Sequence, residues 1–267
     1  MVWFDSHCHF DFPVFDSDRE AIWQWCQQAG VAGLLIPGVS RSQCQQLATV
    51  CQGQPWWYAL GLHPFFTHQP ADLDWLSAQI PAATTACVAV GETGLDWRRA
   101  RTQEQRQQQF ELLDRHIELA RDHDLPLILH AVGAHDELLM RLRRARFDCG
   151  GVIHAFSGSL QQAQRYVDSG FHLGAGGLIS RPNARRVLEA IRYLPASAWL
   201  LETDAPDMTP AFWAESRNSP VCLPLLGQIL ARYWKKSLSE TQVVLLDNLR
   251  QTFPKGAPLL DFQPSKV

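Results

Sequence analysis

The chain has 267 residues, of which 46% are hydrophobic and 19% are charged, and its formal net charge is −3. This composition is typical of globular proteins and excludes collagen-like and low-complexity sequences. The small net charge disfavours a protein that coats duplex DNA, although it permits local binding of a few phosphates.

Eight short apolar runs alternate with longer segments that show helical periodicity. We predict strands at Val2–Phe4, Ala32–Ile36, Trp57–Leu62, Cys87–Val90, Leu125–Leu129, Gly151–Ile153, Phe171–Leu173 and Ala198–Leu201. Helices are predicted at Asp18–Ala29, Arg41–Cys51, Ala71–Ile80, Thr102–His123, Asp136–Ala145, Leu160–Ser169, Pro182–Arg192, Val221–Tyr233 and Ser239–Arg250. Eight consecutive βα units predict an α/β fold of the closed (β/α)8 TIM-barrel type. No linker divides the chain, so we expect a single domain over residues 1–267.

The sequence contains no signal of export or of membrane insertion. No apolar stretch reaches about 18 residues, and the N-terminus lacks a basic region followed by an apolar one. The 7 cysteines are odd in number and form no Cys-x-x-Cys pair, which favours reduced thiols over a disulfide framework. We therefore expect a cytoplasmic protein that needs neither a membrane nor an obligate protein partner.

Histidines and carboxylates follow most of the apolar runs. The C-terminal ends of barrel strands carry the chemistry in this class of fold, and those positions hold His7, His9, His63, Glu92, His130, His154, Glu202 and Asp204. A single histidine after a strand is commonly a hydrogen-bonded structural residue, but unrelated core histidines have no reason to gather at one rim. Imidazoles and carboxylates together are typical ligands of zinc and manganese, so the pattern indicates a metal centre.

Six of these residues are predicted metal ligands, which exceeds the three protein ligands of a typical open zinc site. We therefore predict two divalent cations, whether zinc, manganese or magnesium. Because His7 and His9 lie two residues apart, they point to the same side of a strand. The first ion is assigned to His7, His9 and Asp204, and the second to His130 and His154.

Glu92 is predicted to bridge the two ions. The chain has no lysine before Lys235, which excludes a carboxylated lysine as the bridging group at the fourth strand. The same absence excludes a Schiff-base mechanism, since no amine lies at a strand end. The two carboxylate oxygens of Glu92 can each reach one cation.

The predicted centre suits hydrolysis. A pair of divalent ions lowers the pKa of a shared water molecule from about 16 towards about 7. We predict that Asp204 is the general base and that His63 binds an oxygen of the substrate or protonates the leaving oxygen. The alternative for His63 is a hydrogen-bonded turn histidine before Pro64. Glu202 is predicted to orient a ligand imidazole.

The segments around these residues resemble the TatD family of metal-dependent deoxyribonucleases, in particular its YjjV-type members. The matching motifs are Phe4-Asp5-Ser6-His7-Cys8-His9, Leu60-Gly61-Leu62-His63-Pro64, Val90-Gly91-Glu92-Thr93-Gly94-Leu95-Asp96, Leu129-His130, His154-Ala155-Phe156-Ser157-Gly158 and Leu201-Glu202-Thr203-Asp204-Ala205-Pro206. They occur in this order over nearly the whole chain, which makes the set far more specific than an isolated His-x-His.

The resemblance implies a barrel that holds two divalent ions through the six predicted ligands. It also implies phosphodiester hydrolysis, which in relatives often starts from the 3′ end of single-stranded DNA, so we expect a nucleic-acid substrate. The family commonly has Ser-Arg after the strand-five histidine, whereas Ala131 and Val132 follow His130 here. This departure removes a polar pair that could contact a phosphate, and it therefore bears on substrate choice.

Two other functions remain open from the residues alone. The same metal centre could hydrolyse a carboxylic ester or an amide, including the aminoacyl ester of a tRNA, because the pocket walls select the substrate. A metal-stabilised binding module without turnover would require closed coordination around the ions.

A single-stranded substrate also needs stacking surfaces and phosphate contacts. Aromatic residues in the strand-end loops are Phe10, Phe12, Phe65, Phe66, Trp97 and Phe156, and the arginines there are Arg98, Arg99, Arg101 and Arg181. Loop packing or a solvated loop is the simpler explanation of each one taken alone, so the sequence selects none of them.

Overall fold

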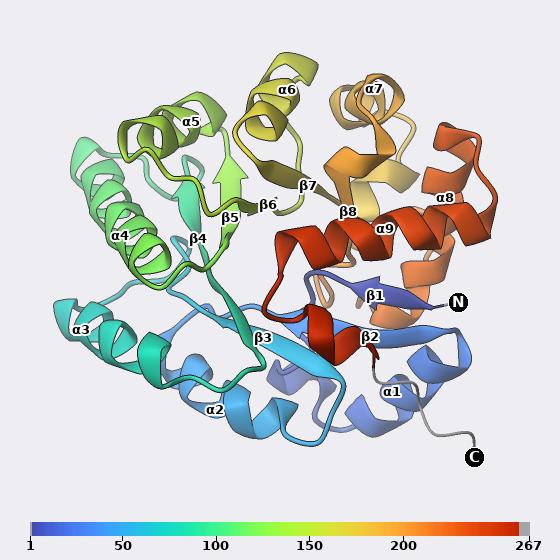
Figure 1. Cartoon of the computed structure of the whole chain (residues 1–267), viewed down its shortest axis with the longest axis horizontal. Helices are drawn as coiled ribbons and strands as arrows, with labels where there is room; N and C mark the ends of the chain where they lie inside the picture. The colour runs from blue at the N-terminus through green and yellow to red at the C-terminus, as the bar shows by residue number, and fades with distance from the viewer. Residues whose placement is uncertain (1, 262–267) are drawn as a thin grey trace.

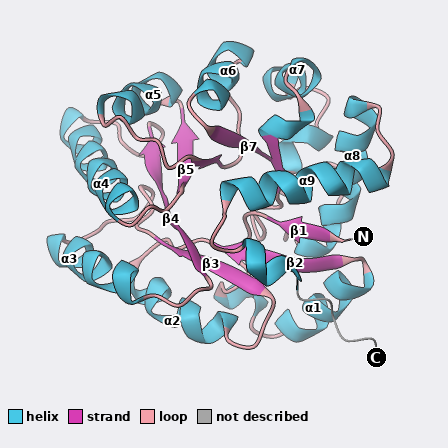
Figure 2. Ribbon diagram, in the orientation of Figure 1, coloured by secondary structure: helices cyan, strands magenta, loops and turns pink. Residues whose placement is uncertain are grey.

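Eight strands alternate with helices in the structure, a computed structural model that describes residues 2–261. The strands are β1 (Trp3–Asp5), β2 (Val31–Ile36), β3 (Trp56–Leu60), β4 (Cys87–Asp96), β5 (Leu127–Val132), β6 (Gly151–Ile153), β7 (Phe171–Ala175) and β8 (Trp199–Leu201). They form one sheet in the order β1 to β8, and every neighbouring pair is parallel. Figure 2 shows the strands inside a ring of helices. The predicted TIM barrel is confirmed.

Helices form the outer layer of the barrel. Within residues 2–261 the α-helices are α1 (Arg19–Gln28), α2 (Arg41–Cys51), α3 (Pro70–Gln79), α4 (Gln103–Asp122), α5 (His135–Arg144), α6 (Leu160–Asp168), α7 (Arg185–Tyr193), α8 (Leu223–Trp234) and α9 (Leu238–Thr252). Helices α4, α6 and α9 begin at capping boxes, in which Thr102, Ser159 and Ser237 bond reciprocally with the residue three positions later. None of the helices in this part of the chain is long and apolar enough to cross a membrane.

The structure differs from the sequence prediction in where some elements begin and end. Helix α7 starts at Arg185 rather than at Pro182, because the N–H of Ala184 bonds the carbonyl of Arg181 at 3.0 Å in a turn. Strand β4 continues past Val90 to Asp96, and β5 continues past Leu129 to Val132. These two extensions pair with each other along their length, and this tertiary pairing outweighs their weak local strand signal. Glu92 and His130 consequently lie within strands.

An apolar layer fills the N-terminal half of the barrel. Its strand residues are Phe4, Leu35, Trp57, Ala59, Val88, Ala89, Ile128, Val152 and Leu200. Leu249 of α9 and Phe253, which follows this helix, join the layer, and Figure 1 shows α9 lying across β8 and β1. Full burial stabilises the folded state by about 1.5–3 kcal/mol for each large apolar side chain. This end of the barrel is therefore sealed, which leaves the opposite end for polar residues.

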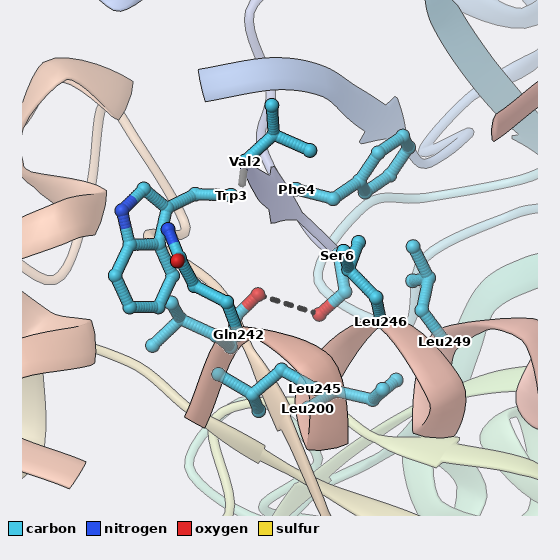
Figure 3. Close-up of a pocket in the computed structure, with 10 residues that line it drawn as sticks. Val2, Trp3, Phe4, Ser6, Leu200, Gln242, Leu245, Leu246 and Leu249 are labelled. Carbon is cyan, nitrogen blue, oxygen red and sulfur yellow. Dashed lines mark hydrogen bonds between the residues drawn. The ribbon is translucent and has the colours of Figure 1, made fainter. Parts of the chain in front are cut away.

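Hydrogen bonds close the sheet between β8 and β1. Ser6 donates to the carbonyl of Leu201 from its backbone N–H and from its hydroxyl, each at 3.0 Å. The N–H of Asp204 donates to the carbonyl of His7 at 2.9 Å. Figure 3 shows that side chains of α9 cover this seam: Leu245, Leu246 and Leu249. The seam holds the residues that follow β1 against those that follow β8.

A buried histidine on α4 supports the loop after β3. His116 accepts a hydrogen bond from the N–H of Leu62 at 3.0 Å through Nε2, and its Nδ1 lies 2.7 Å from the carbonyl of Leu112. Burial lowers the pKa of His116 to about 4, against an opposing contribution from Leu112. The folded protein therefore keeps this imidazole neutral at pH values where the unfolded chain protonates it.

His116 should make the folded protein less stable at acidic pH than at neutral pH. The unfolded state binds a proton below about pH 6.5 and the folded state does so only near pH 4, so the free energy of unfolding decreases as the pH falls through this window. The loss should be about 2 kcal/mol between pH 7.5 and pH 5. Urea unfolding of the wild type and of His116→Gln, both in chelator, measures the difference. Equal pH slopes for the two proteins would contradict this assignment.

Candidate metal centre

His7 and His9 lie on an extended segment that continues β1. The N–H of Cys8 donates to the carbonyl of Leu35 in β2, and the N–H of His9 donates to the carbonyl of Ala205 after β8. The Cys8 side chain is fully buried on the other side of this segment. The alternation along a strand therefore directs both imidazoles to one side, as their spacing predicts.

Glu92 lies between two groups of histidines, and each of its carboxylate oxygens faces a different group. Oε2 lies 3.1 Å from Nε2 of His7 and 3.7 Å from Nε2 of His9. Oε1 lies 3.0 Å from Nε2 of His63 and 3.2 Å from Nδ1 of His130. Burial alone would raise the pKa of Glu92, but the surrounding imidazoles hold it well below its usual range. A charged, buried carboxylate thus joins nitrogen donors from three segments of the chain: the continuation of β1, the loop after β3 and β5.

Asp204 and His154 complete the cluster on the side of His7. Oδ1 of Asp204 lies 3.5 Å from Nε2 of His9 and 3.7 Å from Nε2 of His7. Oδ2 lies 3.6 Å from Nε2 of His154, whose ring stacks on that of His7 with 3.5 Å between the centroids. Donors that follow β1, β6 and β8 therefore converge on one small volume.

This donor set fits a divalent cation. Buried polar atoms with no hydrogen-bond partner among the described residues include both ring nitrogens of His7, Nδ1 of His9 and Oε2 of Glu92. Leaving such an atom unpaired costs on the order of 1–3 kcal/mol, and a bound cation offsets that cost for the atoms that face it. Burial lowers the pKa of His7 and more strongly that of His9, so both imidazoles are neutral and keep a lone pair for a metal.

Three donor groups within residues 2–261 have ligand atoms that all lie within 4.8 Å of one another. These groups are His7–His9–Asp204, His7–His154–Glu202 and His63–Glu92–His130. The first is the set predicted for one ion. The third group places His130 beside His63. Nδ1 of His130 and Nε2 of His154, the pair predicted for the second ion, lie 3.2 and 3.9 Å from the same oxygen, Oε1 of Glu92.

The hydrogen bonds of His63 identify which of its nitrogens carries the proton. Nδ1 accepts the backbone N–H of Phe65 at 3.0 Å, so in the neutral ring the proton is on Nε2. Burial lowers the pKa of His63, although Glu92 opposes this shift, which favours the neutral form. Nε2 then donates to Oε1 of Glu92 at 3.0 Å. This tautomer presents an N–H, and not a lone pair, to the centre.

Comparison with known proteins places the chain in a family. The family model of TatD related DNase matches residues 4–254. The chain belongs to the TatD family. YjjV of Escherichia coli, an uncharacterized metal-dependent hydrolase, is 39% identical over 252 residues, which cover 93% of this chain and 96% of YjjV. The membership confirms the resemblance seen in the motifs and identifies a metal-dependent hydrolase of this family.

The solved structure of YjjV and one further relative define the range of the similarity. The crystal structure of YjjV, a TatD homolog from Escherichia coli, has a TM-score of 0.89 at 37% identity and covers 94% of this chain and 98% of that one. The 3'-5' ssDNA/RNA exonuclease TatD of Salmonella typhimurium is 32% identical over 240 residues, with 85% of this chain and 90% of that protein covered. The likeness therefore extends over almost the whole barrel.

Asp96 is a residue of this TatD-family centre that the sequence prediction missed. Its Oδ2 lies 3.1 Å from Nε2 of His130, while its Oδ1 accepts the N–H of Arg98 at 2.8 Å. Burial opposes a charge on His130, but Asp96 and Glu92 outweigh it and raise the pKa of His130. A carboxylate behind a ligand imidazole fixes its tautomer and orientation. The signal was present in the spacing, because Asp96 lies four residues after Glu92 on one strand and so shares its face.

Replacing Asp96 by asparagine should reverse the tautomer of His130. The amide oxygen can still accept from the loop, but an amide N–H towards Nε2 moves the proton of the ring to Nδ1, which then has no lone pair for a metal. We expect metal affinity to fall about tenfold or more, measured by competition with a chelator. Asp114→Asn, which removes a carboxylate paired with Arg141 on the outer helices, is the control. Unchanged metal affinity in Asp96→Asn would show that Asp96 does not orient the imidazole of His130.

Glu202 lies behind His154. Its Oε1 is 3.2 Å from Nδ1 of His154 and accepts the N–H of Ala155 at 2.6 Å. Burial opposes a charge on His154, but Asp204, Glu202 and Glu92 raise its pKa to about 10. Because Nε2 of the same ring faces Asp204, this placement supports the predicted orienting role of Glu202.

The loop that carries Asp204 is held by groups that the sequence prediction also missed. Asp5 is fully buried and accepts hydrogen bonds from the backbone N–H and the hydroxyl of Thr203, at 2.9 and 2.5 Å. Burial raises the pKa of Asp5 to about 7 against these hydrogen bonds. Nδ2 of Asn218 donates to the carbonyls of Thr203 and Asp207 at 2.8 and 2.7 Å. The contact between Asp5 and Thr203 spans 198 positions of sequence, so no local pattern reveals it.

Proposed function

We propose that this protein is a two-metal phosphodiester hydrolase that acts as a 3′–5′ exodeoxyribonuclease on single-stranded DNA. The observation that carries the proposal is the position of Glu92, whose two oxygens face two separate groups of nitrogen donors. The TatD relative of Salmonella typhimurium is named a 3'-5' ssDNA/RNA exonuclease, which supports this choice of substrate. The proposed ligands are His7, His9, Glu92, His130, His154 and Asp204.

The residues of the centre have distinct proposed roles. When bound, the divalent ions lower the pKa of a water molecule and neutralise charge on the phosphoryl oxygens. Asp204 is the carboxylate that accepts the proton of the attacking water. His63 presents its Nε2–H to a phosphate oxygen of the substrate or to the leaving oxygen, because its Nδ1 is occupied by the N–H of Phe65. Glu202 and Asp96 orient the imidazoles of His154 and His130.

Parallel assays of three substrates test this function. The metal-loaded protein is incubated with a single-stranded DNA oligonucleotide, a phosphomonoester and an aminoacyl ester, each with Zn²⁺, Mn²⁺ or Mg²⁺. We expect shortening of the oligonucleotide from its 3′ end at the highest kcat/KM. Hydrolysis of the aminoacyl ester alone would replace this function with the esterase alternative. Full metal content without hydrolysis of any of the three would favour a binding module.

His63→Ala should separate turnover from metal binding. The variant loses the N–H donor but no lone pair of the proposed ligands, so we expect metal content to match the wild type while kcat falls about 100-fold. Elemental analysis and single-turnover kinetics measure the two quantities. His68→Ala removes a neighbouring imidazole that lies 2.8 Å from the carbonyl of His63 and serves as the control. Loss of one ion from His63→Ala would make His63 a ligand instead.

A further inference from the structure

Two aromatic side chains on the rim of the metal centre are exposed, and a guanidinium lies over the ring of one of them. Phe65, in the loop after β3, is 46% exposed, and the adjacent Phe66 is 44% exposed. The guanidinium carbon of Arg99, in the loop after β4, lies 3.5 Å from the centroid of the Phe65 ring. Across residues 2–261, the guanidinium of Arg99 forms no ion pair. A flat aromatic surface and an unneutralised cation thus stand together beside the site.

Hydrogen bonds tie both members of this pair to the metal centre. The N–H of Phe65 donates to Nδ1 of His63, which reaches the central carboxylate at 3.0 Å through Nε2. The N–H of Arg99 donates to Oδ1 of Asp96 at 3.2 Å, and Oδ2 of Asp96 contacts Nε2 of His130 at 3.1 Å. An arginine over an aromatic ring is common on protein surfaces, but this one is held at a fixed position relative to the proposed ligands.

The other aromatic residues of the rim offer less free surface. Phe10 and Phe156 are fully buried and belong to the core. Phe12 and Trp97 are half-buried, and each already packs against a neighbouring ring. Among the aromatic residues of the loops after β1, β3, β4 and β6, Phe65 and Phe66 are therefore the exposed ones. The guanidinium over Phe65 distinguishes this surface from Phe212, which is 43% exposed in the loop after β8.

We infer that the Phe65–Arg99 pair binds a nucleobase next to the phosphodiester that is cleaved, an inference that rests on the proposed function. A nucleobase is planar and stacks on aromatic rings and on guanidinium planes. The positive charge of Arg99 complements the phosphates that flank the base. A simple carboxylic ester or a simple phosphomonoester has no such planar group at this position. The pair thus selects single-stranded nucleic acid without reading its sequence.

Removal of the base from the substrate tests this subsite. Two single-stranded DNA oligonucleotides are compared that differ only in having natural or abasic nucleotides at the last two 3′ positions. The KM of each is measured with metal-loaded wild type, Phe65→Ala, Arg99→Ala and Arg99→Lys. Binding is measured in parallel by fluorescence anisotropy with oligonucleotides whose 3′ linkages are phosphorothioates. Arg192→Ala, which removes an arginine that lies 5.4 Å from the ring of Tyr233 on the outer helices, is the matched control.

The measured quantity is the preference for the natural oligonucleotide, defined as the KM of the abasic oligonucleotide divided by the KM of the natural one. We expect this preference to fall about tenfold in Phe65→Ala and Arg99→Ala and to stay at the wild-type value in Arg192→Ala. Arg99→Lys keeps the positive charge but loses the planar guanidinium group. This variant should therefore lose the preference for the natural oligonucleotide while its binding still weakens with added salt. Equal weakening of both oligonucleotides in every variant, or no change in any, would overturn the subsite.

The outcomes also separate this inference from the proposed function. A wild type that binds the natural oligonucleotide more tightly through Phe65 and Arg99, but does not shorten it, would refute the nuclease and leave the subsite standing. A wild type that shortens both oligonucleotides with equal KM would refute the subsite and leave the nuclease standing. Thermal unfolding of each variant identifies any substitution that destabilises the fold. If an alanine variant is destabilised, the preference measured for Arg99→Lys tests the subsite in its place.

Discussion

Glu92→Gln is expected to abolish hydrolysis and to release the bound metal. The substitution keeps the shape of the side chain but replaces one carboxylate oxygen by an amide that cannot bind a cation. The oxygens of Glu92 lie 3.1 Å from His7 and 3.0 Å from His63, so the change affects both halves of the centre. Loss of a residue behind a ligand alone lowers activity or metal affinity about 10–100-fold, and loss of a bridging ligand should exceed the upper value.

Elemental analysis of the purified protein and kcat/KM on the oligonucleotide are the two readouts. Glu118→Gln is the matched control, since Glu118 pairs with Arg115 on the exposed face of α4 and is not one of the proposed ligands. We expect the control to retain both metal and activity. Full metal content together with the wild-type rate in Glu92→Gln would disprove its bridging role.

Gly94→Ala is expected to destabilise the barrel strongly. Gly94 lies in the extended part of β4 with a φ of +142°, and a Cβ built there would overlap the carbonyl oxygen of His130 in β5. Both the backbone conformation and the space therefore exclude a side chain. We expect a loss of about 2–6 kcal/mol, since a side chain in this sparsely populated backbone region costs on the order of 1–3 kcal/mol and overpacking adds about 1–3 kcal/mol. Metal affinity should fall as well, because β4 and β5 carry Glu92 and His130.

Gly53→Ala isolates the conformational part of this cost. Gly53 has a φ of +74°, but no atom lies within 4 Å of a Cβ built on it. Its substitution should cost only about 1–2 kcal/mol, measured by urea unfolding beside Gly94→Ala. Similar losses in the free energy of unfolding for the two variants would contradict the claim that the close approach of β4 to β5 requires a glycine at position 94.

The sequence predicts the barrel and the members of the candidate site because both depend on chain order. Apolar runs that alternate with amphipathic segments indicate βα units, and the chemistry of a barrel lies at the C-terminal strand ends. His7, Glu92 and Asp204 come from distant segments, yet the fold brings an oxygen of Glu92 and an oxygen of Asp204 within 4 Å of Nε2 of His7. This convergence follows from topology alone.

The sequence does not predict how the donors are grouped. Whether His130 lies nearer to His63 or to His154 depends on how far each loop reaches across the barrel end, and no spacing in the chain encodes that reach. The same holds for Asp5 and Thr203, which bond each other across 198 positions of sequence. The long pairing of β4 with β5 also lacks a local signal, because glycines and polar residues interrupt it.

Anomalous diffraction from crystals of the Mn²⁺- or Zn²⁺-loaded protein tests the central claim most directly. The account predicts two peaks in contact with the carboxylate of Glu92, one of them also beside His7, His9 and Asp204. Peaks that lie only elsewhere on the molecule, with these side chains uncoordinated at saturating metal, would contradict it.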